Sequence, residues 1–182
     1  LVENAFADIR AEGSPIVDRP PQISPAVDVR HKELEQSHVC LGAPGLAQNH
    51  PDRYAAYVLN TVLGGSMSSR LFQNVREKRG LAYAVFSGLS AYHDAGSINI
   101  YAGCANEAVV ELIDVVVGEL RQLKRDGLTA GELRRAKDHL KGSLMLNLES
   151  TSSRMSHLAR QEIYRDRADS LDEMLAEIEK VT

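Results

Sequence analysis

The sequence has few cysteines and lacks any apolar run long enough to span a bilayer. Cys40 and Cys104 are the only cysteines among 182 residues, and each lies in its own apolar segment. Two isolated cysteines in a domain of this size are more often buried free thiols than a disulfide, so we expect free thiols, with one disulfide as the alternative. A membrane helix needs about 20 consecutive apolar residues, so we expect no membrane partner.

The chain also lacks a strong excess of charge of either sign. It has 21 basic and 25 acidic residues, a formal net charge of -4, and no basic stripe interleaved with aromatic residues. Nucleic acid is therefore not an expected partner. Hydrophobic residues make up 43% and charged residues 25%, which is typical of a folded globular domain and not of a disordered chain.

Motifs that carry catalytic chemistry are missing as well. None of the six histidines occurs as H-E-x-x-H or H-x-x-E-H, and His139 and His157 are expected to be solvent-exposed. There is no nucleophile elbow, P-loop or dinucleotide fingerprint. Gly64-Gly65-Ser66 resembles part of a phosphate loop, but no lysine follows, and a tight turn between helices is the better interpretation. The sequence predicts no metal site in this chain.

Three regions can be distinguished along the chain. Residues 1–12 are predicted to be the tail of a helix from a preceding domain, because Val2, Phe6 and Ile9 have helical spacing. Residues 13–26 are rich in proline and are predicted to form an interdomain linker. Residues 27–182 would then form one domain, truncated at its end, because Val181-Thr182 is typical of the lead-in to a further helix.

The sequence of the first half of this domain predicts two strands, two helices and two further strands, in that order. Strands are expected at Asp28–Glu33 and Ser37–Gly42, helices at Asn49–Leu63 and from Ser68 or Ser69 to Gly80, and strands at Leu81–Tyr92 and Ser97–Cys104. Glycine at position 80 suits the end of a helix. In the last strand apolar residues alternate with polar ones, the period of a half-buried strand.

The second half is predicted to be helical. Asn106 is expected to cap a helix whose inward residues include Val110 and Val116, and Thr129 and Ser170 each begin a capping box. A further helix is expected from Ser150 to Arg165, and the last covers Leu171–Ile178. This order predicts an α+β domain, with helices on one face of an antiparallel sheet.

The segment Leu63–Tyr83 contains L-G-G, a short serine spacer, S-R-L-F and R-E-K-R-G-L-A-Y. It resembles the signature of the C-terminal half of pitrilysin-type and mitochondrial-processing-peptidase-type zinc peptidases, the inverzincins. Three further segments resemble the family in the same order, namely Leu34–His38, Thr129–Lys137 and Asn147–Thr151. The resemblance covers nearly the whole chain, and the central motif is specific.

The resemblance implies the fold, the cofactor and the domain partner. Members of the family have paired α+β domains of the LuxS/processing-peptidase-like metallohydrolase fold. The first domain binds Zn²⁺ through H-x-x-E-H, and the second closes over the peptide. This chain matches only the second, so zinc would be held by the N-terminal domain of the same protein and not by this chain. The fragment alone is expected to be inactive.

The resemblance also implies site residues. Arg76 and Tyr83 match the arginine and tyrosine through which the second domain reaches the peptide near the scissile bond. A guanidinium can bind a peptide carbonyl, and a phenol can donate to a developing oxyanion. From pattern alone, Arg76 would be a cation near a helix C-terminus and Tyr83 an ordinary strand residue.

Together these points predict a zinc endopeptidase that binds extended peptides in a two-domain chamber. The alternative is a non-catalytic structural or partner subunit of the same family; the short spacer after L-G-G and the retained arginine–tyrosine pair favour the catalytic type. A free-standing peptide-binding module is a third, weaker interpretation. A homodimer is compatible with the sequence, and the bacterial-type spacer favours the cytoplasm.

Overall fold

The computed structural model describes residues 7–8, 20–165 and 167–182. Its strands and helices follow the order β1 (Ser37–Gly45), α2 (Arg53–Leu63), the π-helix η1 (Phe72–Glu77), β2 (Ala82–Ala91), β3 (Gly96–Cys104), the 3₁₀-helix η2 (Asn106–Ala108), α3 (Val109–Asp126), α4 (Ala130–Asn147), α5 (Thr151–Arg165) and α6 (Leu171–Glu179). Most of the predicted helix tail and proline-rich linker lies outside the described residues, so the boundaries of these regions remain predictions.

The sheet is antiparallel and has the strand order β1-β3-β2. β2 and β3 form a hairpin, and β1 pairs with the other side of β3, with Leu41 opposite Ile100. Apolar side chains alternate along β3, where Ile100, Ala102 and Cys104 point to the buried face. The alternation predicted for this strand is confirmed.

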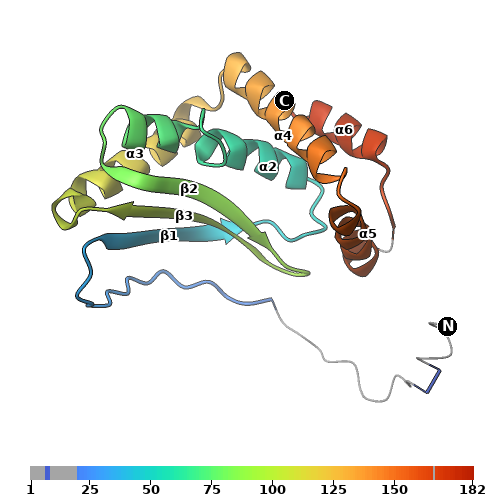
Figure 1. Cartoon of the computed structure of the whole chain (residues 1–182), viewed down its shortest axis with the longest axis horizontal. Coiled ribbons are helices and arrows are strands. Elements are labelled where there is room, and N and C mark those ends of the chain that lie inside the picture. Colours follow the sequence, from blue (N-terminus) through green and yellow to red (C-terminus); the bar gives the residue numbers. More distant parts are fainter. Residues whose placement is uncertain (1–6, 9–19, 166) are drawn as a thin grey trace.

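Helices cover one face of the sheet, and the other face is open (Figure 1). The main core lies between the sheet and the first helical layer; it contains Leu63 from α2, Leu71 and Val75 from the η1 region, and Leu112 and Val116 from α3. The opposite side of α2 contacts α4 through Val58, Val62 and Ala136, and contacts α6 through Tyr54, Met174 and Ile178. Helix α2 is thus buried on two sides, and the predicted α+β fold is confirmed.

The prediction of a strand at Asp28–Glu33 is wrong. This stretch has no regular structure, and Val27 and Val29 are 93% and 79% exposed. A β-pattern forms a strand only where a neighbouring backbone offers hydrogen bonds, and no described strand lies beside this segment. The second predicted strand is confirmed and extends to Gly45.

Two helix starts also differ from the prediction. Helix α2 begins at Arg53, because residues 50–52 form a turn in which the Asp52 amide donates to His50 Nδ1 at 3.1 Å. Asn106 does not cap α3: its side chain accepts a hydrogen bond from Ser37 Oγ at 2.7 Å, and η2 precedes the helix. A distant partner has replaced the local cap. The capping boxes at Thr129 and Ser170 are both confirmed.

Candidate functional site

A short helical segment places Arg76 at the edge of the sheet. The segment continues from Arg70 into the π-helix η1, in which Val75 is fully buried and Arg76 is half-exposed. π-Helical turns widen the backbone and are frequent at functional sites. Gly80 then adopts φ +61°, and the Leu81 amide donates to the Val75 carbonyl at 2.9 Å. This reversal returns the chain at once into β2.

Tyr83 lies at a β-bulge near the start of β2. The register pairs Ala82 with Cys104 and Ala84 with Gly103, so Tyr83 has no partner on β3. An extra residue of this kind turns its side chain away from the normal alternation, and bulges occur often beside active sites. The Tyr83 side chain is accordingly 78% exposed, although Ala82 before it is buried.

The reversal and the bulge bring Arg76 and Tyr83 together. The guanidinium carbon of Arg76 lies 4.5 Å from the centroid of the Tyr83 ring and 4.8 Å from that of Phe72. Within the described residues its ion pair is with Glu77, at 3.6 Å between Nε and Oε1. A guanidinium over a ring keeps its N–H edges in its own plane, where they can still donate hydrogen bonds to a peptide. The pair is therefore assembled and accessible.

A buried ion pair anchors the segment that carries Arg76. Arg70 Nε and Nη2 donate to Glu132 Oε1 and Oε2 at 2.7 and 2.9 Å, and Nη2 also reaches the Gly127 carbonyl at 3.0 Å. These hydrogen bonds from Arg70, together with weaker effects of hydrogen bonds from Thr129, lower the pKa of Glu132 to about 2. Because Glu132 also completes the capping box with Thr129, the ion pair ties the start of α4 to the helix before η1.

Sequence reasoning missed an aromatic group on the open face of the sheet. Phe86 is 52% exposed, and its ring centroid lies 5.1 Å from that of Tyr101, which is directly opposite on β3. Tyr101 OH and His38 Nδ1 are 2.8 Å apart. These residues occupy outward positions in adjacent strands, so pairing the strand alternations would have identified them. Both cysteines are free as expected, but Cys40 is exposed on this face, and the expectation that it is buried is wrong.

No group of three or more histidines, cysteines or carboxylates in the described residues is arranged to hold a metal ion. His139 is exposed as predicted, but His157 is half-buried and its Nε2 lies 3.2 Å from Met174 Sδ, so the prediction for His157 is wrong. Burial lowers the pKa of His157, and the nearby Arg160 lowers it further. No helix in the described part of the chain is both long and apolar enough to cross a membrane.

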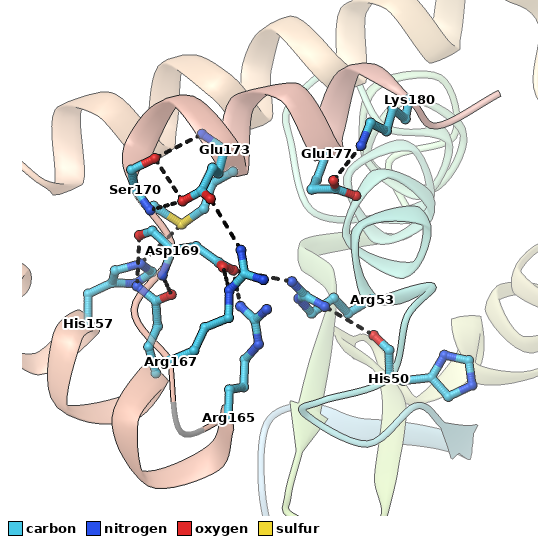
Figure 2. Close-up of polar contacts among 12 residues, drawn as sticks. His50, Arg53, His157, Arg165, Arg167, Asp169, Ser170, Glu173, Glu177 and Lys180 are labelled. Atoms are coloured by element: carbon cyan, nitrogen blue, oxygen red, sulfur yellow. Dashed lines mark hydrogen bonds and ion pairs between the residues drawn. The ribbon is translucent and has the colours of Figure 1, made fainter.

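A second polar cluster, also unforeseen, surrounds Asp169 between α2, α5 and α6 (Figure 2). The Asp169 carboxylate, 5% exposed, contacts Arg165, Arg167 at 2.6 Å and Arg53 at 3.6 Å. Its amide donates to Gln161 Oε1 at 2.7 Å. Burial alone would raise the pKa of Asp169, but the hydrogen bonds from Arg165 and Arg167 outweigh burial and lower it.

Comparison with known proteins relates the chain to one family. The family model described as "Peptidase M16 inactive domain" matches residues 1–140. The uncharacterized zinc protease YmxG of Bacillus subtilis is 44% identical over 180 residues, which cover 99% of this chain and 44% of that protein. The chain thus spans less than half the length of this curated relative.

Solved structures show the same relationship. The peptidase M16 inactive domain from Pseudomonas fluorescens superimposes with a TM-score of 0.74 at 28% identity, over 81% of this chain and 35% of that one. A protease from Helicobacter pylori gives a TM-score of 0.78 at 25% identity, over 99% of this chain and 45% of that one.

Proposed function

Because the chain belongs to the peptidase M16 family, in which it represents the inactive C-terminal domain, we propose that it is the substrate-binding half of a zinc endopeptidase. The observation that carries the proposal is the contact between the Arg76 guanidinium and the exposed Tyr83 ring, at 4.5 Å. A strand-edge site with one cation and one phenol can bind a peptide backbone without any metal of its own.

The two side chains would act on different oxygens of the peptide. Zinc, bound by an N-terminal domain, would supply the activated water. Arg76 would bind a backbone carbonyl of the peptide near the scissile bond through its planar N–H groups. The Tyr83 phenol would donate a hydrogen bond to the scissile carbonyl oxygen as this oxygen gains negative charge. The contact with Tyr83 and Phe72 holds the Arg76 side chain in place before the peptide arrives.

The sheet offers a backbone edge where an extended peptide could lie. Among the described strands, β2 pairs only with β3. On its other edge the Ser87 amide donates to the Gly64 carbonyl at 3.2 Å, whereas no described strand pairs there with the stretch between Tyr83 and Ser87. A peptide that adds as a short strand to this stretch would gain main-chain hydrogen bonds largely independent of its sequence. Since Tyr83 lies at one end of β2, the peptide would pass the arginine–tyrosine pair there.

The test is Tyr83→Phe in the protein that contains this chain together with its zinc-binding domain. Loss of one oxyanion donor should lower kcat for an extended peptide roughly ten- to a thousandfold, with a smaller effect on KM. Tyr92→Phe is the matched control, because Tyr92 is 64% exposed just beyond the other end of β2. Kinetics of Tyr83→Phe equal to those of the control would remove the proposed role of the phenol.

A further inference from the structure

A cavity of about 290 Å³ lies among α2, α4, α5 and α6. Its apolar wall is formed by Tyr54, Tyr57, Leu140, Leu144, Met174 and Ile178. None of the lining residues belongs to η1 or β2, so the cavity is separate from the arginine–tyrosine pair. At about 30 Å³ for each water-sized group, it has room for about ten non-hydrogen atoms.

Cationic side chains line the same cavity. Arg53, Arg160 and Arg165 all contribute to its lining, and Arg53 and Arg165 are only 15% and 19% exposed. Figure 2 shows Arg53 and Arg165 converging with Arg167 on the single carboxylate of Asp169. No described residue forms an ion pair or hydrogen bond with the Arg160 guanidinium. Within the described residues, the lining therefore carries an excess of positive charge.

The cavity also contains an uncharged hydrogen-bond donor. Burial raises the pKa of the Tyr57 phenol, and this effect outweighs the opposite effect of Arg53. The phenol is therefore protonated at neutral pH. A ligand here would meet apolar carbon together with guanidinium donors and a phenol donor. Such a lining favours a molecule that has an anionic head and an apolar tail.

We propose that this cavity binds a small aliphatic carboxylate, with the carboxylate beside Arg160 and the hydrocarbon against Leu140, Leu144 and Met174. A chain of about eight carbons fits the volume. A carboxylate is favoured over a doubly charged phosphate because Asp169 already neutralises part of the positive charge. The inference is independent of the proposed peptidase role.

The first experiment is calorimetric titration of the 182-residue chain with octanoate and with octanol. Octanoate should bind with a dissociation constant at least tenfold lower than that of octanol, because only the carboxylate can use the guanidinium donors. N-acetylleucine is titrated in parallel as a model of a peptide C-terminus. If N-acetylleucine binds more tightly than octanoate, the cavity still binds a carboxylate, but its ligand is a peptide C-terminus and the proposed aliphatic carboxylate is overturned. Equal affinity for octanoate and octanol, or no binding of any probe at millimolar concentration, would overturn the proposal.

The second experiment compares Arg160→Gln with Arg154→Gln. Both arginines lie on α5, but only Arg160 lines the cavity. Octanoate affinity should fall about tenfold in Arg160→Gln and stay unchanged in Arg154→Gln. Neither residue has a described ion pair, so both variants should fold, and far-UV circular dichroism checks this. An equal loss in the two variants would mean that general surface charge, and not this cavity, attracts the anion.

Discussion

At the residue scale, the ion pair of Arg70 and Glu132 controls where Arg76 lies. Both side chains are largely buried, at 12% and 18% exposure, and both Glu132 oxygens accept hydrogen bonds from the guanidinium. A bidentate pair of this kind is geometrically specific and much stronger than a surface ion pair. Because Arg70 lies at the start of the segment that carries Arg76, loosening this pair would also loosen the candidate site.

The pair predicts a pH-dependent stability. The pKa of Glu132 is about 2 in the folded chain, below its ordinary value of 4.5, so its contribution is present above pH 4.5 and is lost as the pH falls towards 2. Glu132→Gln, which can still complete the capping box, should lower the free energy of unfolding by about 2 to 3 kcal/mol at pH 7. Urea unfolding at pH 7, 4 and 2.5 measures this.

The control for Glu132→Gln is a carboxylate that forms no ion pair or hydrogen bond with a described side chain. Glu162 is exposed on α5 and has no described partner, so Glu162→Gln should match the unaltered chain at every pH. The destabilisation by Glu132→Gln should shrink steadily as the pH is lowered. A difference as large at pH 2.5 as at pH 7 would show that the charge of Glu132 contributes nothing.

At the scale of elements, the first glycine of the L-G-G motif, Gly64, allows the end of α2 to approach β2 closely. A Cβ atom at Gly64 would lie 2.5 Å from the Ser87 amide nitrogen and 2.8 Å from its Oγ. The Ser87 amide also donates to the Gly64 carbonyl at 3.2 Å. The turn interpretation of this motif is therefore physically sound, but the reason for glycine is a contact with a strand that follows later in the chain.

Gly64→Ala should destabilise the fold by about 1 to 3 kcal/mol, because the strand backbone must move to admit the methyl group. Gly88 is the matched control: it lies next to Ser87 on the other face of β2, and nothing lies within 4 Å of a Cβ atom built there. Gly88→Ala should change stability by less than about 0.5 kcal/mol. Thermal unfolding of both variants measures the difference, and equal midpoints would contradict the close-approach explanation.

The sequence predicted whether a segment is a helix or a strand better than it predicted which side of that element is buried. In α3, Val110 was predicted to face inward but is 72% exposed, whereas Leu112 is fully buried. The run Val109–Val117 is apolar at so many positions that several helical phases fit it equally well, and only packing against the sheet selects one. The strand predicted at Asp28–Glu33 failed for a related reason, since its pattern could not show whether a partner strand was present.

At the scale of the whole molecule, the two faces of the sheet have different tasks. One is covered by α2 and α3 and holds the core, and the other is open (Figure 1). The open face carries Phe86, Tyr101 and His38. An open sheet face beside the arginine–tyrosine pair is suited to contact with a second domain or an enclosed peptide. This arrangement supports the proposal that one domain carries the zinc chemistry and the other binds the peptide.

This division predicts that the 182-residue chain is inactive by itself. It should not cleave a fluorogenic extended peptide, and added zinc should not change this, because no described cluster of ligands can hold the ion. The longer protein with an intact H-x-x-E-H motif should cleave the peptide and lose activity with a chelator. Zinc-dependent cleavage by the isolated chain would contradict the division; an inactive longer protein with an intact motif would favour the non-catalytic role.

The sequence by itself determined the element order from Ser37 onwards, the α+β class, both capping boxes and the motif that contains Arg76 and Tyr83, because these depend on local spacing and local hydrogen bonds. Tertiary structure alone decided the contact of Arg76 with Tyr83 and Phe72, the exposure of Cys40, the half-burial of His157 and the arginine cluster around Asp169. Each of these depends on which surfaces meet when helices pack on a sheet. Residues far apart in the chain acquire neighbours, charges and depth only through that packing.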